Sequence, residues 1–293
     1  MLRQRLLLGP VLIAALIGII WLDAYLQRVT GIAALIILPA MVLIGIMAGR
    51  ELGVIFKTRG IRSSRLITCI AVVLGLVVSS FTARDHAGLS GVAIVCTAAG
   101  FVLLGSMIYY ARNHTTDGVL AATAVTLLAF VYVGLMGGFL VVLRKEHDGW
   151  LILGILLITK AYDIGAYFTG RAIGRHKLIP WLSPGKTWEG LVGGLLVASG
   201  MGVLCVFAAR WTGVAQVVAD LNPAAGAVLG LLFGLVGQGG DLMASLLKRD
   251  AGVKDYSSVL PGFGGVLDVI DSPLLVAPVA YWTLAATANI LST

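Results

Sequence analysis

The chain has 293 residues, of which 59% are hydrophobic and only 12% are charged, and its mean hydropathy is +0.99. So little polar surface excludes a water-soluble globular domain of this size and predicts an all-α protein that crosses a membrane several times. The net charge of +7 does not indicate nucleic-acid binding, because the basic residues are scattered over the loops, where anionic lipid headgroups are the natural partner.

Nine apolar runs are long enough, or nearly so, to cross a bilayer as helices of about 20 residues. We expect the first run to be a retained helix and not a cleaved signal peptide, because it lacks a small-residue cleavage site and further spans follow. The three cysteines, Cys69, Cys96 and Cys205, lie far apart in apolar runs and predict neither a disulfide nor a metal site. The runs are approximately 5–22, 31–48, 66–82, 88–110, 118–143, 150–170, 190–209, 224–247 and 273–292.

The distribution of basic residues predicts the orientation in the membrane. If the N-terminus is cytoplasmic and the runs alternate, fifteen Lys or Arg residues fall on the cytoplasmic side and five on the other. Because cytoplasmic loops carry the excess of Lys and Arg, this bias predicts a cytoplasmic N-terminus in the inner or plasma membrane.

The first five runs carry almost no internal polar groups, so we expect residues 1–145 to form a membrane-anchoring scaffold. The basic loop between Arg50 and Arg65 is expected to enforce topology, and holding anionic headgroups is its alternative use. We expect residues 146–293 to form the catalytic region, with two cytoplasmic motif loops and C-terminal helices around a polar cavity open to the cytoplasm.

Charged residues first enter a membrane run at Lys160 and Asp163. At positions i and i+3 of a helix the two side chains can pair, which lowers the cost of burying them. A structural salt bridge is one interpretation, and the other is that Asp163 faces the same polar cavity as Asp241.

The loop that follows, residues 170–190, is rich in polar residues and glycine. Gly185-Lys186-Thr187 matches the end of a phosphate-binding Walker A loop, but that motif would need a glycine where Pro180 stands, so the motif is excluded. In the eighth run, Gly230, Gly234 and Gly237 favour close helix packing, and Gly239 and Gly240 are expected to open or bend the helix just before Asp241.

The densest set of charges lies between Gly237 and Ser272, among almost purely hydrophobic neighbours. Carboxylate oxygens suit Mg²⁺, cations suit phosphates, and glycines let a backbone approach a phosphate, so this stretch indicates metal-assisted phosphate chemistry. A solvated loop is the plainer interpretation. Two details favour a site: Asp241 lies within an apolar helical run, and Asp268 and Asp271 share one helix face.

These residues also carry a resemblance to a known family. Ser245-x-x-Lys248-Arg249, Lys254-Asp255 and the segment from Pro261 to Asp271 are similar to the pattern S-x-x-K-R-x-x-x-x-K-D and P-G-H-G-G-x-x-D-R-x-D of CDP-diacylglycerol synthases, the phosphatidate cytidylyltransferases. A second hallmark of that family resembles D-x-G-A-Y-F-x-G-R, G-K-H-K-L and S-P-x-K-T-W-E-G, which Asp163 to Gly190 match with Arg175 in place of a Lys. The resemblance covers roughly residues 160–275. Phe263 stands where the family has His, and Val269 where it has Arg.

The resemblance implies an enzyme that transfers CMP from CTP to phosphatidic acid, giving CDP-diacylglycerol and pyrophosphate. It implies a bound Mg²⁺ or another hard divalent cation, with a monovalent cation as an open addition, and leaves a homodimer open. The implied metal ligands are Asp241, Asp268 and Asp271. The implied catalytic residues are these three with Lys248, Arg249, Lys254 and Asp255. The implied nucleotide-binding or supporting residues are Asp163, Arg171, Lys177, Ser183, Lys186, Thr187, Glu189, Gly264 and Gly265.

Two other classes of protein stay open. A membrane transporter is favoured by glycine-rich helices and intramembrane Lys160, Asp163 and Asp241, but most charges gather in two loops on one face and no inverted repeat is present. A catalytically weak or silent relative that binds phosphatidic acid or nucleotide is favoured only by Phe263 and Val269.

Overall fold

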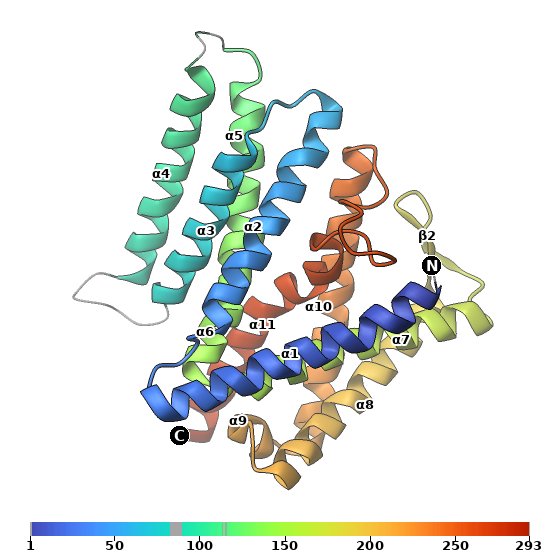
Figure 1. Ribbon diagram of the computed structural model, residues 1–293. Helices are drawn as coiled ribbons and strands as arrows, with labels where there is room; N and C mark the ends of the chain where they lie inside the picture. Colours follow the sequence, from blue (N-terminus) through green and yellow to red (C-terminus); the bar gives the residue numbers. More distant parts are fainter. Residues whose placement is uncertain (1, 83–89, 113, 115, 293) are drawn as a thin grey trace.

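The computed structural model describes residues 2–82, 90–112, 114 and 116–292, which form a bundle of long helices (Figure 1). The predicted all-α membrane fold is confirmed, apart from one short hairpin. In chain order the elements are α1 (Leu2–Thr30), α2 (Ile37–Ile55), the 3-10 turn η1 (Phe56–Arg59), α3 (Arg65–Thr82), α4 (Gly91–Ala111), α5 (Val119–Leu128), the π-helical segment η2 (Ala129–Leu135), α6 (Met136–Glu146), α7 (Gly149–Ile173), β1 (Lys177–Ile179), β2 (Ser183–Thr187), α8 (Trp188–Thr212), α9 (Gln216–Ala219), α10 (Pro223–Asp250) and α11 (Leu267–Ser292).

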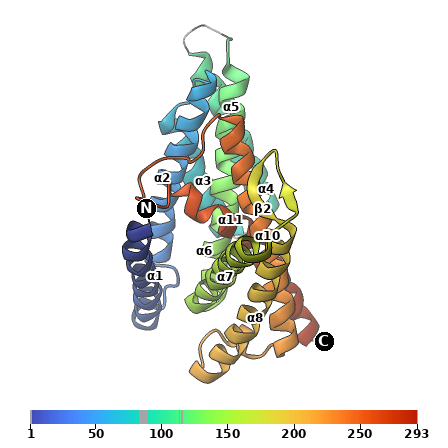
Figure 2. The same cartoon turned by 90° about the vertical axis from the view of Figure 1, so that its right-hand side faces the viewer.

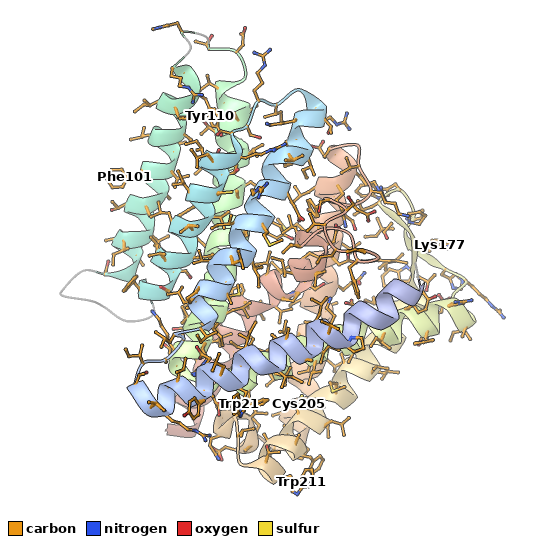
Figure 3. All side chains as sticks on the ribbon, viewed as in Figure 1. Trp21, Phe101, Tyr110, Lys177, Cys205 and Trp211 are labelled. Carbon is orange, nitrogen blue, oxygen red and sulfur yellow. The ribbon has the colours of Figure 1, made fainter. Side chains whose placement is uncertain are left out.

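Each of the nine predicted runs overlaps a helix, and α5, η2 and α6 continue one another as a single span. The run 31–48 begins six residues before α2, and the first two residues of the run 88–110 lie outside the described part of the chain. Eight helical stretches in the described part of the chain are long and apolar enough to cross a membrane, and α3 is a shorter apolar helix. Large apolar side chains point outward from the bundle, such as Phe101 (71% exposed) and Trp211 (91% exposed) (Figure 3). Such an apolar outer surface is stable against lipid chains and not in water, so the protein is a multi-pass membrane protein.

Two groups of helices lie on either side of α10 and α11 (Figure 1). One hydrophobic core joins α2, α3 and η2 to α10 and α11 through residues such as Leu52, Leu76 and Leu274. A second core joins α7 and α8 to the same two helices, through residues such as Ile158 and Phe233. Figure 1 and Figure 2 both place the hairpin and the segment between α10 and α11 away from the C-terminus. The two motif stretches therefore lie on the same side of the bundle, away from the C-terminus.

Glycines bring α7, α8 and α10 into close contact. A Cβ on Gly194 of α8 would lie 2.8 Å from the ring of Tyr162 on α7, and Gly202 of α8 lies against Gly226 of α10. The predicted close packing along α10 is confirmed at Gly230, which contacts the backbone of α8. Small residues permit such approaches between membrane helices, where packing is the main attractive force.

The expectation that α10 opens before Asp241 is wrong. The helix is continuous from Pro223 to Asp250. Instead, Gly240 makes room for α11, because a Cβ there would lie 2.7 Å from the carbonyl oxygen of Asp271. Breaking the helix would expose backbone polar groups in an apolar environment. The glycines instead allow α11 to pack closely while α10 keeps its backbone hydrogen bonds.

Two elements have no counterpart in the predicted runs. The segment after α7 forms an antiparallel hairpin in which Lys177 pairs with Thr187 and Ile179 with Ser183. The four-residue helix α9 lies between α8 and α10. The hairpin turns the chain back into α8, so Lys186 and Thr187 lie at the start of that helix.

The first half of the chain buries more polar groups than its sequence suggests. Asp23 (0% exposed) and Arg144 (1% exposed) form an ion pair, with 2.5 Å between Oδ2 and Nε. The other oxygen of Asp23 accepts the amides of Ile36 and Ile37, so it caps the start of α2. This pair fixes α1, α2 and α6 to one another.

Candidate functional site

A cavity of about 520 Å³ lies where the two motif stretches meet. Its wall is made by α7, the hairpin, the start of α8, α10 and the start of α11. Eight of the predicted site residues that carry polar side chains line this cavity: Asp163, Arg171, Ser183, Lys186, Thr187, Asp241, Asp268 and Asp271. The sequence was therefore right that Asp163 and Asp241 face one polar cavity, and right that Asp268 and Asp271 share a face.

The first charged pair in the cavity joins the hairpin to α10. Lys186, on β2, forms an ion pair with Oδ2 of Asp241, in the middle of α10. The two side chains are 20% and 33% exposed, so both are partly screened from solvent. The pair crosses from one motif stretch to the other, which explains why residues 55 positions apart belong to one site.

The second charged pair is more deeply buried. Lys248 Nζ lies 2.7 Å from Oδ1 of Asp268, and the side chains are only 12% and 7% exposed. Oδ2 of Asp268 accepts the amide of Gly265 at 2.8 Å and the amide of Tyr256 at 2.9 Å. A buried ion pair is weak evidence for stability, because desolvation offsets most of the attraction. Asp268 lines the cavity and Lys248 does not, so this pair presents its carboxylate to a ligand.

Asp271 is buried at 3% exposure and has no lysine partner among the described residues. Its Oδ1 accepts the amide of Ser272 at 2.6 Å and the hydroxyl of Ser272 at 3.2 Å. An uncompensated carboxylate at this depth is costly unless a cation approaches it.

Four carboxylates thus line one cavity, those of Asp163, Asp241, Asp268 and Asp271, and their hard oxygen atoms are the donors that Mg²⁺ prefers. Within the described residues, however, no group of three Asp, Glu, His or Cys side chains is already drawn together as metal ligands. Lys186 and Lys248 occupy the faces of Asp241 and Asp268 that a cation would need. The donor set fits a divalent cation, and the assignment of Asp241, Asp268 and Asp271 as its ligands stays a prediction.

On the α7 side of the cavity, Lys160 Nζ lies 3.1 Å from Oδ2 of Asp163, which confirms the predicted pairing. Both side chains are more than 40% exposed, so the pair contributes little to stability. About two turns further along α7, Arg171 donates to the hydroxyl of Tyr167 at 2.9 Å. The ammonium group of Lys160 and the guanidinium group of Arg171 are therefore available on this wall to bind an anion in the cavity.

The start of α8 is held by Thr187, whose hydroxyl accepts the amide of Gly190 at 3.1 Å as a helix N-cap. The next polar residue, Glu189, lies outside the cavity lining and accepts from His176, with 2.6 Å between Oε1 and Nδ1. Glu189 therefore ties the hairpin to α8 and supports the site from outside.

Several predicted site residues do not line the cavity. Arg249 and Lys254 are exposed, and the Arg249 guanidinium donates to the carbonyl oxygen of Val253 at 3.2 Å. Lys177 and Asp255 are also exposed and outside the lining. Their sequence positions placed them near the site, but their side chains lie on its outer surface.

Gly264 and Gly265 lie against two carboxylates in this structure, and their expected approach to a phosphate stays a prediction. Gly264 adopts a φ of +94°, and a Cβ there would lie 2.7 Å from Oδ2 of Asp268. A Cβ on Gly265 would lie 2.6 Å from an oxygen of Glu51. The two glycines let the backbone fold around these carboxylates.

Glu51, on α2, is a residue next to the site that the sequence did not reveal, and it supports the start of α11 without lining the cavity. It is 6% exposed and accepts three hydrogen bonds from the far end of the chain. Its donors are the hydroxyl of Ser257 at 2.7 Å and the amides of Val266 and Leu267, both at 2.8 Å. Glu51 therefore caps the start of α11, immediately before Asp268 and one turn before Asp271.

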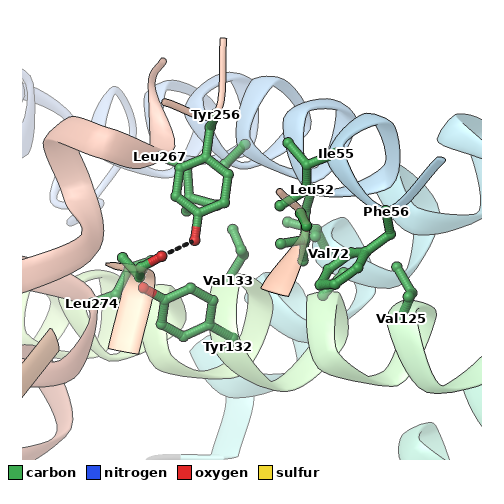
Figure 4. Close-up of a cluster of buried hydrophobic side chains, with 14 of the residues drawn as sticks. Leu52, Ile55, Phe56, Val72, Val125, Tyr132, Val133, Tyr256, Leu267 and Leu274 are labelled. Atoms are coloured by element: carbon green, nitrogen blue, oxygen red, sulfur yellow. Dashed lines mark hydrogen bonds between the residues drawn. The ribbon is translucent and has the colours of Figure 1, made fainter. Parts of the chain in front are cut away.

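The floor beneath the carboxylates is a hydrophobic cluster in which two tyrosines meet (Figure 4). Tyr256 is 3% exposed, and its hydroxyl donates to the carbonyl oxygen of Ala244 at 3.2 Å. Burial raises the pKa of Tyr256 far above its usual range, so the hydroxyl stays a donor. Tyr132, on η2, is 1% exposed, and its hydroxyl lacks a hydrogen-bond partner in the described structure. Replacing either ring would disturb the packing that supports α10 and α11.

The two departures from the family pattern lie close in the chain to Asp268 and to Gly264 beside it, but their side chains do not line the cavity. Neither Phe263 nor Val269 is among the residues that line it. The Phe263 ring lies near α1, where a Cβ on Gly9 would be 4.0 Å from it. The cavity wall itself therefore keeps the family's charged residues.

The fold and the cavity define a multi-pass membrane protein whose carboxylates and lysines converge on one polar site, a set suited to phosphate ligands. The chain belongs to the cytidylyltransferase family, whose family model matches residues 3–287, and the predicted membership of the CDP-diacylglycerol synthase family is confirmed.

Three relatives show how far the similarity extends. The phosphatidate cytidylyltransferase of Bacillus subtilis is 33% identical over 276 residues, which are 88% of this chain and 97% of the relative. That of Haemophilus influenzae is 41% identical over 45% of this chain and 44% of its own length. That of Mycobacterium bovis is 31% identical over 67% of this chain and 62% of its own length. The chain thus spans less than two thirds of the last two relatives and nearly all of the first.

Proposed function

We propose that the protein is a phosphatidate cytidylyltransferase that transfers the CMP group of CTP to phosphatidic acid. A phosphate oxygen of the lipid forms a bond to the α-phosphorus of CTP, the bond from that phosphorus to the β-phosphate oxygen breaks, and pyrophosphate leaves. The attacking oxygen is already anionic, so the step needs positioning and charge neutralisation more than a general base.

One observation carries this proposal: Lys186, Asp241 and Asp268 line one cavity in a membrane protein. Lys186 is paired with Asp241 and Lys248 with Asp268, and the two pairs draw on both motif stretches. Each lysine is held by a carboxylate and could turn to a phosphate oxygen, which would leave the carboxylate to a cation. Charge would stay balanced when a polyphosphate and a cation enter together.

Mg²⁺, held by Asp241, Asp268 and Asp271, would neutralise phosphate charge as a Lewis acid when bound. Lys186 and Arg171 are placed to hold the nucleotide phosphates from the α7 and hairpin side. Lys248 is placed to hold a phosphate beside Asp268. Exposed Arg249 and Lys254 are suited to bind the lipid headgroup at the membrane surface. In this proposal the N-terminus lies on the cytoplasmic side. The homodimer and a monovalent cation stay predictions.

The proposal is tested with purified protein, labelled CTP, phosphatidic acid and Mg²⁺, scored for a lipid-soluble CDP product. Asp241→Asn is the sharpest variant, because this carboxylate forms an ion pair with Lys186 and caps no helix in the described structure, so its loss should leave the fold intact. We expect turnover to fall by about 100-fold or more. Asp268→Asn should abolish turnover too, while the protein still inserts.

Asp250→Asn is the matched control, since Asp250 is an exposed carboxylate at the end of α10 that does not line the cavity. It should keep wild-type turnover. A wild-type protein that binds CTP or phosphatidic acid but forms no product would support the silent relative instead. Full activity in Asp241→Asn would remove this carboxylate from the reaction.

A further inference from the structure

A second concave surface lies between α2 and α3, apart from the catalytic cavity. It is a groove of about 690 Å³, and it shares no lining residue with the cavity. Its walls are mostly apolar and include Ile46, Leu66, Ile70 and Val73. Leu66 and Ile70 are 63% and 53% exposed, so this face of the bundle is turned to the bilayer.

The groove is built on a tight crossing of two antiparallel helices. Gly45, Gly49 and Gly53 recur every four residues on α2 and face α3. A Cβ on Gly49 would lie 3.1 Å from the side chain of Val72, and one on Gly53 would lie 2.8 Å from the hydroxyl of Thr68. Because the helix backbones are this close, the two walls stay at a fixed separation.

Two arginines stand at the η1 end of the groove. Arg50 comes from the last turns of α2 and Arg65 is the first residue of α3. Both are exposed, and neither guanidinium forms an ion pair or a hydrogen bond with another described residue. The neighbouring acid, Glu51, is buried and bonded to the start of α11, so it does not neutralise them.

We propose that this groove binds an anionic glycerophospholipid of the surrounding leaflet. Its phosphate would lie between Arg50 and Arg65, because guanidinium groups bind phosphate through paired hydrogen bonds. One acyl chain would run along Ile70 and Val73. Charge complementarity selects this occupant over a zwitterionic lipid, since an apolar groove that ends in two unpaired cations fits a ligand with an apolar tail and a net negative head. The inference does not depend on the proposed reaction.

The test is lipid binding measured by native mass spectrometry, with phosphatidylglycerol and phosphatidylcholine titrated separately. We expect the wild type to bind phosphatidylglycerol more tightly, and Arg50→Gln/Arg65→Gln to weaken that binding about 30-fold, which corresponds to about 2 kcal/mol. The matched control is Lys57→Gln/Arg62→Gln, which removes two exposed charges from the same basic loop outside the groove. It should stay within about twofold of the wild type.

A third variant keeps all charges. Ile70→Trp places a bulky ring in the groove at an exposed position, so it should also weaken phosphatidylglycerol binding without unfolding the protein. Equal losses in the two double variants would mean that surface charge alone binds the lipid, and the proposal would be overturned. The same spectra report oligomeric state: if Arg50→Gln/Arg65→Gln dissociates a dimer that forms without added lipid, a second copy covers the groove and the proposal also fails.

Discussion

Replacing Glu51 shows how much the first half of the chain shapes the site. In Glu51→Ala, the buried amides of Val266 and Leu267 lose their acceptor and Ser257 loses its partner. A buried donor without an acceptor costs about 1–3 kcal/mol. The amide of Gly265, in the same segment, donates a hydrogen bond to Asp268. Loosening the segment therefore displaces the Asp268 carboxylate, which lines the cavity.

We expect local opening at the start of α11 to become easier by about 2–4 kcal/mol in Glu51→Ala, which corresponds to amide exchange about 30- to 900-fold faster. Glu51→Gln should give a smaller effect, since one oxygen remains but the amide hydrogens of the new side chain face another N–H donor. Product formation should fall by up to about 100-fold in Glu51→Ala, because misplaced catalytic groups lose effective concentration.

The measurement is hydrogen exchange by mass spectrometry on peptides that cover residues 256–268, in lipid nanodiscs. Glu146→Gln is the control, as it removes a half-buried carboxylate at the end of α6, far along the chain from this segment. Exchange in Glu51→Ala that equals exchange in Glu146→Gln would refute the reasoning, because the three hydrogen bonds would then not hold α11 in place.

Three further predictions concern packing, burial and pH. Gly240→Ala should lower stability by about 1–3 kcal/mol by pushing α10 from α11, while Gly100→Ala, with open space around it, should be neutral or slightly stabilising, as measured by thermal unfolding. Asp23→Ala should cost about 3–5 kcal/mol because it strands the buried Arg144 cation, and adding Arg144→Leu should recover part of that loss; a double variant no more stable than Asp23→Ala would contradict this. Burial lowers the pKa of His147, so the folded state binds fewer protons at this residue than the unfolded state. The contribution of His147 to stability is therefore present above the unfolded pKa and is lost as the pH falls. Between about pH 7.5 and 5.5 the Tm of the wild type should fall relative to the Tm of His147→Gln.

The spans could be predicted because about 20 apolar residues in a row have few alternatives to a membrane helix. The motif residues of the second half were also predictable, and Asp163, Lys186, Asp241, Asp268 and Asp271 do meet in one cavity. Their partners were not: spacing along the chain does not say that Lys186 faces Asp241 or that Lys248 faces Asp268.

Other features were beyond the sequence for physical reasons. Glu51 lies 215 residues before Val266 and just outside an apolar run, so no local pattern marks its contact. The continuity of α10 through Gly239 and Gly240 depends on the neighbouring helix, which a local breaker signal ignores. The hairpin was missed because β1 and β2 are short and β2 contains Pro184 and Gly185, residues typical of turns.

The long separation between Glu51 and its donors has a consequence for biogenesis. The ribosome finishes α2 well before it makes Ser257, Val266 and Leu267. For most of synthesis, the Glu51 carboxylate therefore lacks the three donors that it binds in the folded protein. The cavity wall is complete only when α11 inserts, because the start of α11 forms part of that wall. Truncations that end before α11 should consequently leave α2 unsettled in the bilayer and expose it to quality-control proteases.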